Sequence, residues 1–252
     1  MLGIERRQLI MDKIKQDKKV YVSELSQLFR VTEETVRRDL EKLEGDNLLR
    51  RSYGGAVLNE QKASEDLSFL KRSTINSETK EYIAQKAQDL ISDGDTIMVD
   101  SSTTCLALLH HLQKHKDITI ITNSIRLAYD FSTAPFRIIS TGGSLRSNSM
   151  ALTGSATCTA LERYYADIAL ISCKGIHKQL GVMESNEEES VVKQIMLAQA
   201  KKSLLLIDSS KFDKTAFVKT CELSAIDTLV TDKRPEDSWL ETLTQKQVEL
   251  IY

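Results

Sequence analysis

The feature that most constrains the fold is an alternation of short apolar runs and helical patterns beyond residue 78. Helical spacing of apolar residues predicts helices over 78–91, 103–113, 124–131, 155–165, 188–201 and 238–246. The apolar runs predict strands at 96–100, 118–122, 137–141, 168–173, 204–208, 228–231 and 248–251. Strands that alternate with helices predict an α/β domain, in which a mostly parallel sheet has helices on both faces.

Small polar or glycine-rich turns follow five of these predicted strands. They are DSSTT at 100–104, TNS at 122–124, TGG at 141–143, CKG at 173–175 and DSSK at 208–211. A single such turn is ordinary helix capping. In open parallel sheets, however, ligands bind outside the carboxyl ends of the strands, and a helix N-terminus binds anions. Recurrence at one sheet edge therefore predicts a pocket for a small phosphorylated, hydroxyl-rich ligand.

A different pattern fills the first 58 residues. After a predicted helix over 4–17, Ser23 and Thr32 are placed to cap two short helices. Apolar residues at helical spacing give the second of them a buried face. A ribbon with turn-forming glycines follows at 48–57. This order predicts a winged helix-turn-helix, with the helix-turn-helix at about residues 20–39.

Polar and basic side chains gather on the exposed parts of this predicted unit. The candidate DNA-contacting residues are Thr32, Glu33, Thr35, Arg37 and Arg38 on the second helix, and Arg50, Arg51 and Tyr53 on the ribbon. A helix that enters the major groove needs such a front near its N-terminus, and a wing places cations against phosphates. Net charge does not decide the matter, because 34 basic and 36 acidic side chains give −2. A binding module without DNA function, whose charges are only solvated, therefore remains an alternative.

Several motifs resemble the DeoR family of bacterial transcription regulators. In the first 58 residues they are Arg6-Arg7, VSEL at 22–25, VTEETVRRDL at 31–40 and GGAV at 54–57. Farther along, the DSSTT, TNS, TGG and DSSKF segments and NEEESVVKQIM at 186–196 resemble the family's effector-binding domain, which itself resembles sugar-phosphate isomerases. The resemblance implies a repressor of a sugar uptake or catabolism operon, relieved by a phosphorylated sugar.

The same resemblance implies an effector site. Its residues are Asp100, Ser101, Ser102, Thr103 and Thr104 for the phosphate, with Thr122, Asn123, Ser124, Gly142, Gly143, Lys174, Glu189, Lys193, Asp208 and Lys211 lining or bracing the sugar. Two positions depart from the family pattern. Ser102 stands where the family usually has glycine, and Lys174 stands where small or acidic residues are common.

The predicted organisation is a DNA-binding domain at 1–58, a linker at 59–77 and an effector-binding and oligomerisation domain at 78–252. The expected partners are double-stranded operator DNA, a phosphorylated sugar and further copies of the chain, as a homodimer or homotetramer. An isomerase-like enzyme is the competing hypothesis, with Glu184, Glu188 or Glu189 as base and Lys174 or Lys193 as electrophile. No complete acid/base signature accompanies these residues, so we expect a protein that is not an enzyme.

The four cysteines, Cys105, Cys158, Cys173 and Cys221, form no CxxC pair and lie far apart. Mostly apolar neighbourhoods predict buried, reduced thiols rather than a disulfide framework or a metal site. We expect no cofactor. No apolar run approaches the ~20 residues needed to span a bilayer, so we expect a cytoplasmic protein without membrane association.

Overall fold

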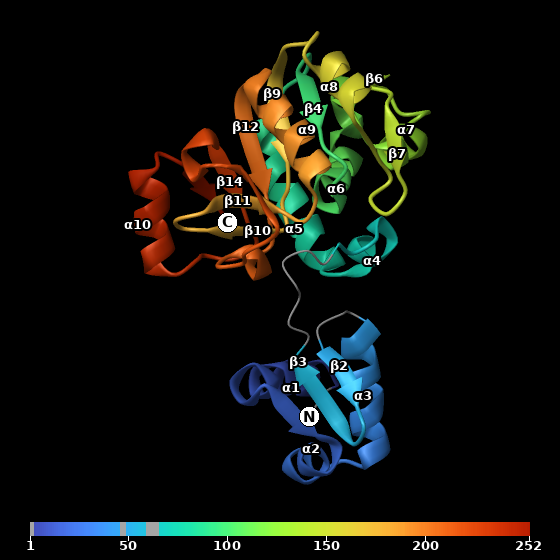
Figure 1. Ribbon diagram of the computed structural model, residues 1–252, viewed down its shortest axis with the longest axis vertical. Helices are drawn as coiled ribbons and strands as arrows, with labels where there is room; N and C mark the ends of the chain where they lie inside the picture. The colour runs from blue at the N-terminus through green and yellow to red at the C-terminus, as the bar shows by residue number, and fades with distance from the viewer. Residues whose placement is uncertain (1–2, 46–48, 59–65) are drawn as a thin grey trace. The chain divides into compact units, whose positions relative to one another are not determined.

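The structure, a computed structural model, describes residues 3–45, 49–58 and 66–252 of the 252-residue chain (Figure 1). The chain divides into two compact units, Met1–Lys62 and Ala63–Tyr252, which we call the N-terminal and C-terminal units. Of the sequence-based predictions, the linker segment 59–65, Leu48 of the ribbon and the side chain of Ile4 lie outside the described residues.

The N-terminal unit is a winged helix-turn-helix, as the sequence predicts. Its elements are α1 (Gly3–Asp17), β1 (Lys19–Tyr21), α2 (Val22–Phe29), α3 (Glu33–Gly45), β2 (Leu49–Ser52) and β3 (Gly55–Leu58). The strands pair antiparallel in the order β1-β3-β2, so the strand before α2 is hydrogen-bonded to the wing. Its core combines Ile10 and Ile14 of α1 with Leu25, Leu40 and Leu49 of the following elements.

The turn between α2 and α3 is held by local hydrogen bonds. Arg30 adopts a left-handed conformation with φ of 53°, and its N–H donates to the Gln27 carbonyl at 3.3 Å. The Val31 N–H donates to the Ser26 carbonyl at 3.1 Å, and Ser26 Oγ donates in return to the Val31 carbonyl at 2.7 Å. These bonds satisfy the last carbonyls of α2 and fix the direction in which α3 leaves the turn.

The C-terminal unit is built on a seven-stranded sheet. Its strands are β4 (Thr96–Val99), β5 (Thr119–Thr122), β6 (Arg137–Ser140), β9 (Ala166–Ile171), β12 (Ala200–Leu206), β14 (Thr228–Val230) and β15 (Glu249–Ile251). They lie in the order β15-β14-β12-β9-β4-β5-β6, and every neighbouring pair is parallel. All seven correspond to predicted strands. The turns predicted to gather at one edge therefore do so, because they follow parallel strands.

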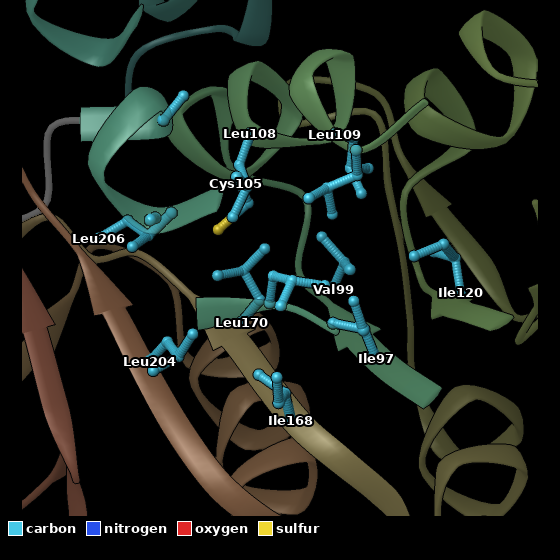
Figure 2. Packing of buried hydrophobic residues seen from close by; sticks show 14 of the residues in the cluster. Ile97, Val99, Cys105, Leu108, Leu109, Ile120, Ile168, Leu170, Leu204 and Leu206 are labelled. Carbon is cyan, nitrogen blue, oxygen red and sulfur yellow. The ribbon is translucent and has the colours of Figure 1, made fainter. Parts of the chain in front are cut away.

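Helices cover both faces of this sheet. Alternate strand residues, such as Val99 and Leu170, pack with α5 (Ser77–Ala87) and α6 (Thr103–His111). Figure 2 shows Cys105 and Leu108 of α6 beside them in this layer. Residues of the opposite parity, such as Met98, pack instead with α8 (Ser155–Leu161) and α9 (Glu187–Ala198). Each fully buried aliphatic side chain contributes about 1.5–3 kcal/mol relative to exposure, so both faces stabilise the unit.

A third cluster of buried residues lies under α10 (Asp237–Gln245), where Trp239 packs with Leu205 and Leu229. The helix α7 (Ile125–Asp130) corresponds to the helix predicted over 124–131. Apolar side chains therefore cover the sheet from its centre to the β15 edge.

The sequence did not predict several small elements. They are the hairpin β7 (Ser144–Arg146) and β8 (Ala151–Thr153), the antiparallel sheet of β10 (Gly175–His177), β11 (Gly181–Glu184) and β13 (Val218–Cys221), and the helix α4 (Phe69–Thr74). The predicted linker at 59–77 overlaps α4, whose Phe69 is buried within the C-terminal unit. Phe69 N donates to the Asn148 carbonyl at 2.7 Å, which ties this segment to the β7–β8 turn. None of the described helices is long and apolar enough to cross a membrane.

Candidate functional site

The N-terminal end of α3 presents the polar front that the sequence predicts. Thr32 Oγ1 accepts a hydrogen bond from the Thr35 N–H at 3.3 Å, so Thr32 caps the helix. Val36 and Leu40 are buried on the opposite side. The side chains of Arg37 and Arg38 are 51% and 76% exposed. A helix with an apolar back and such a front is suited to lie in the major groove.

The exposed arginines of α3 are paired with carboxylates one turn earlier. Arg37 Nη2 lies 2.6 Å from Glu33 Oε2, and Arg38 Nε lies 3.8 Å from Glu34 Oε1. Exposed pairs of this kind are worth roughly 0–1 kcal/mol, so a phosphate or a base edge can replace the carboxylate at small cost.

The wing carries the second group of predicted residues. Arg50 and Tyr53 are exposed, and Gly54 has a φ of +82° at the tip. Arg51 is held by two ion pairs, because its guanidinium lies 2.7 Å from both Glu41 and Glu44 of α3. These ion pairs join the wing to the C-terminal half of α3.

One polar residue of α3 has a role that the sequence analysis did not assign. Asp39 is buried, and its Oδ2 lies 2.5 Å from Arg6 Nε. Its Oδ1 lies 3.3 Å from Arg7 Nη1. The pair Arg6-Arg7 and Asp39 both stood in the motifs of the resemblance, but spacing alone does not reveal that α1 and α3 are joined by an ion pair.

In the C-terminal unit, the turn after β4 is buried rather than open. Asp100, Ser102 and Thr103 are each less than a tenth exposed, as are Ser101 and Thr104. Ser102 Oγ accepts from the Cys105 N–H at 3.2 Å and caps α6. The remaining N–H groups of the first helical turn have no acceptor within the helix, so this end of α6 is suited to an anion.

Beneath this turn, Lys193, Glu184 and Asp100 form a buried cluster. Lys193 Nζ contacts Glu184 Oε2, lies 3.3 Å from Asp100 Oδ2 and donates to the Ser172 carbonyl at 2.8 Å. Burial opposes the charge on Lys193, but the carboxylates of Glu184 and Asp100 outweigh it and raise the Lys193 pKa. Burial likewise opposes the charge on Glu184, but Lys193 outweighs it and lowers the Glu184 pKa. Lys193 and Glu184 are therefore charged at neutral pH, and Asp100 and Lys193 brace the turn from below.

In the turns after β5 and β6, some side chains hold the turn by hydrogen bonds, whereas others leave polar groups or exposed backbone for a ligand. Thr122 Oγ1 donates to the Val99 carbonyl at 2.7 Å, and Ser124 Oγ accepts from Leu127 N at 3.2 Å. Asn123 Nδ2 donates to the Leu152 carbonyl, whereas its buried Oδ1 has no hydrogen-bond partner in the part of the chain that the structure describes. Gly142 and Gly143 are exposed, with φ of 67° and 120°. Asn123 Oδ1 is therefore placed to accept a hydrogen bond from a ligand hydroxyl.

Two cations that the sequence analysis missed lie at the same sheet edge. The segment that holds α4 and α5 supplies Arg72 and Lys80, and Thr103 Oγ1 lies 3.5 Å from the Arg72 carbonyl. Arg72 Nη2 is buried without a hydrogen-bond partner among the described residues. Lys80 Nζ is buried and donates to the carbonyls of Arg72 and, at 2.6 Å, Ile75. Burial, together with the nearby cations Lys211 and Arg72, lowers the Lys80 pKa to about 8 against the opposing effect of Asp208.

The other residues predicted for the effector site are held by contacts of their own. Asp208 Oδ1 accepts from Asn76 Nδ2 at 3.3 Å and from the Ser210 N–H at 3.0 Å, which shapes the turn that carries Lys211. The Lys174 N–H donates to the Met183 carbonyl at 3.0 Å. Glu189 is buried on α9, where its Oε1 lies 2.7 Å from Arg146 Nη1.

All four cysteines are free thiols, with Cys105 and Cys173 buried and Cys158 and Cys221 partly buried. Burial raises the pKa of Cys173 to about 12, which keeps that thiol protonated. Within the described ranges, no group of three His, Cys, Asp or Glu side chains is arranged to hold a metal ion.

Comparison with known protein families identifies both units. The model of the DeoR-like helix-turn-helix domain matches residues 6–62, and that of the DeoR C-terminal sensor domain matches residues 75–233. The chain belongs to the DeoR family. It is a DNA-binding transcription regulator with a C-terminal sensor domain, as the resemblance implied.

Relatives of this DeoR-family chain match it over nearly its whole length. The HTH-type transcriptional repressor GlcR of Bacillus subtilis is 38% identical over 98% of this chain and 95% of its own length. The glycerol-3-phosphate regulon repressor of Escherichia coli is 32% identical over 99% of both chains. The L-fucose operon activator of Haemophilus influenzae is 36% identical over 98% of both chains.

A solved structure of ribose 5-phosphate isomerase A from Methanocaldococcus jannaschii is similar to 54% of this chain and 55% of its own, with 17% identity and a TM-score of 0.39. The assignment to the DeoR family does not depend on this low similarity.

Proposed function

We propose that this regulator represses a sugar uptake or catabolism operon and that a phosphorylated sugar releases it from the operator. Two of its relatives are named repressors, of which one is named for the glycerol-3-phosphate regulon. A third is named an operon activator.

This proposal rests on a buried donor and a buried acceptor that both lie at one edge of the sheet without hydrogen-bond partners in the described part of the chain. Arg72 Nη2 and Asn123 Oδ1 both lack partners among the described side chains, although groups buried in this way are normally hydrogen-bonded. Arg72 lies beside Thr103 in the first turn of α6, a suitable place for a phosphate. Asn123 Oδ1 is suited to a hydroxyl. A phosphorylated sugar supplies both groups, whereas inorganic phosphate supplies only the first.

The proposed effector site consists of residues that touch the ligand and residues that hold them. The first turn of α6, Asn123, Arg72 and Lys80 bind the ligand, with Gly142, Gly143, Lys174 and Lys211 around it. Thr122, Ser124 and Asp208 shape the turns through their own hydrogen bonds. Asp100, Lys193 and Glu189 act from below as members of ion pairs.

We infer that the site binds its ligand without chemical turnover. Proton abstraction next to a carbonyl needs a carboxylate whose pKa is near the working pH. Glu184 is instead held by Lys193, and its pKa is lowered. Glu189 is bound to Arg146, and Glu188 Oε2 accepts from Thr153 Oγ1 at 2.9 Å. Each carboxylate considered as a base is thus engaged in another contact.

We further propose that the protein acts in the cytoplasm as a homodimer or larger oligomer. Each chain has one reading head, and two-fold symmetric operators require two. The direct DNA contacts in this proposal are Thr32, Glu33, Thr35, Arg37 and Arg38 in the major groove, and Arg50, Arg51 and Tyr53 along the backbone. Sedimentation velocity of the purified chain distinguishes a monomer from these assemblies, and a monomer that still binds operator fragments tightly would exclude the proposed symmetry.

Operator binding is tested by electrophoretic mobility shift with DNA from upstream of the protein's own gene and of its neighbours. We expect sequence-preferring, salt-sensitive binding by the wild type. Arg38→Ala should weaken it by about 1–3 kcal/mol if Arg38 reads a base. Arg234→Ala is the matched control, because Arg234 is also exposed and paired with a nearby carboxylate, Asp237, but lies in the C-terminal unit. Equal binding by all three proteins would place Arg38 outside the operator contacts.

Effector binding is tested by thermal shift with glucose-6-phosphate, fructose-1-phosphate, glycerol-3-phosphate and inorganic phosphate. A ligand that binds only the folded state raises the unfolding temperature by mass action. At least one sugar phosphate should do so more strongly than inorganic phosphate, and Lys80→Met should abolish the shift. Lys86→Met on the same helix is the control, because Lys86 lies over the Tyr82 ring instead. No shift with any sugar phosphate would reject the proposed ligand class.

A further inference from the structure

Asp66 is the first described residue of the C-terminal unit after segment 59–65, and three hydrogen bonds hold it on the β7–β8 hairpin. Its Oδ2 is bound by Arg146 Nη2 and, at 2.7 Å, by Asn148 Nδ2. Asn148 Nδ2 also donates to the Asp66 carbonyl at 2.8 Å. We call Asp66, Arg146 and Asn148 the Asp66 clasp. It fastens the point at which the chain coming from the DNA-binding unit enters the sensor unit.

The clasp is also connected to the ion pairs beneath the effector site. Arg146 binds Glu189 as well as Asp66, and Glu189 lies one helical turn before Lys193 on α9. On the other side, Ser185 Oγ lies 3.5 Å from Asp66 Oδ1, and Ser185 N donates to Glu184 at 2.8 Å. Contacts therefore run from Asp66 through Ser185 and Glu184 to Lys193, and a second route through Arg146 and Glu189 reaches the same helix one turn earlier. Both routes stay within the C-terminal unit.

The charges of the clasp make it responsive to an anion. Burial opposes the charge on Asp66, but hydrogen bonds from Arg146 and Asn148 outweigh it, with a further contribution from Arg72, and the Asp66 pKa is lowered. Asp66 is thus ionised at neutral pH and lies in the field of Arg72, the proposed phosphate-binding cation. A phosphate bound at Arg72 neutralises that cation and so removes its attraction for Asp66.

We propose that the Asp66 clasp couples the effector site to the segment that leads to the DNA-binding unit, and that effector binding loosens it. This inference rests on the proposed function, because it takes a phosphorylated sugar as the effector. A ligand shifts such an equilibrium only through different affinities for its two states. Here the difference arises because Arg72 attracts Asp66 while the clasp is closed and is freer to bind the phosphate when the clasp is open.

The first test compares wild type with Asp66→Asn, which keeps the shape of the side chain but removes its charge. The readout is the ratio of operator dissociation constants with and without the sugar phosphate that gives the largest thermal shift. We expect the wild-type ratio to fall within the roughly 5–150-fold range of allosteric coupling and the variant ratio to fall below about twofold. The variant should still show a ligand-induced thermal shift. Asp237→Asn, at an exposed pair on α10, should behave as wild type.

Two results of this test would overturn the inference. One is an Asp66→Asn protein with the wild-type ratio, because the clasp would then carry no coupling. The other is a variant that no longer binds the ligand, because Asp66 would then belong to the effector site itself.

A second test needs no variant and no effector. Coupling is reciprocal, so operator DNA alone should change the hydrogen-exchange protection of the Phe69 amide, which donates to the Asn148 carbonyl. Unchanged protection overturns the inference even if Asp66→Asn does not fold. If no sugar phosphate shifts the wild-type unfolding temperature, the proposed ligand fails, and this measurement with DNA still decides whether the clasp is coupled to operator binding.

Discussion

The buried ion pair between α1 and α3 predicts a large effect of one substitution in the DNA-binding unit. Asp39→Ala leaves Arg6 without its carboxylate, where the Arg6 side chain is only 10% exposed. Removal of one partner from a buried pair costs about 3–5 kcal/mol. Arg7 is 23% exposed and can turn to water, so we expect the lower part of this range, about 3–4 kcal/mol.

This loss is comparable with the whole stability of the unit. A unit of 62 residues has roughly 3–9 kcal/mol at 0.05–0.15 kcal/mol per residue. One kcal/mol shifts the unfolding temperature of such a small domain by roughly 4–8 °C, so Asp39→Ala should lower it by at least about 12 °C. Scanning calorimetry should show this for the transition of the N-terminal unit only. Operator binding should be lost as that transition falls below the assay temperature.

A double variant separates charge burial from shape. Replacement of a buried ion pair by apolar residues is often neutral, so Arg6→Met with Asp39→Leu should recover most of the lost stability. Asp12→Ala is the matched control, because Asp12 is exposed and accepts a hydrogen bond from Gln8 at 3.2 Å on the surface of the same unit. A loss below about 1 kcal/mol for Asp39→Ala, or a double variant no better than the single one, would refute the reasoning.

Three further predictions concern two residues of the wing and the pH dependence of stability that Lys80 causes at the sheet edge. Gly55→Ala should unfold the wing, because an added Cβ would lie 2.1 Å from the Val20 carbonyl oxygen. Gly45→Ala should not, because an added Cβ there would lie in open space. Far-UV circular dichroism and operator binding compare the two variants. Arg50→Ala should weaken binding to specific and unrelated DNA alike and reduce the salt slope by about 1, and an unchanged slope would place Arg50 away from phosphates. The Lys80 pKa falls from 10.5 unfolded to about 8 folded, so the unfolded state holds more protons between these values and stability should rise with pH across that window. Thermal unfolding from pH 7 to 10.5 should show that rise in the wild type and not in Lys80→Met.

The parallel sheet was predictable because its strands are short continuous apolar runs between amphipathic helices. Residues such as Met98 and Val99 face opposite helical layers, so each strand is apolar on both faces. The strands β10 and β7 escaped prediction for the opposite reason. Each has only three residues and depends on pairing with the next strand of a hairpin rather than on a periodic pattern.

The missed cations show where residue type misleads. Lys80 lies on a helix with an apolar face, and its residue type gives no hint of its position, since lysine is seldom buried. Its burial depends on two carbonyls, of Arg72 and Ile75, whose positions follow from α4 and the turn after it. Segment 66–76 is polar in sequence and suggests a linker, although Phe69 anchors it in the core. Only the assembled unit shows that these residues reach the sheet edge.

The three-stranded sheet of the DNA-binding unit has a consequence for the operator. Because β3 pairs with β1, and the Val22 N–H donates to the Gly54 carbonyl at 2.9 Å, the wing tip is bound to the start of the helix-turn-helix. Arg51 binds the other end of α3 through Glu41 and Glu44. Helix α3 and the wing therefore contact the duplex at two places that are a fixed distance apart. A base pair inserted within a half-site, between the bases under α3 and the backbone under the wing, should abolish recognition as completely as a change in the bases themselves.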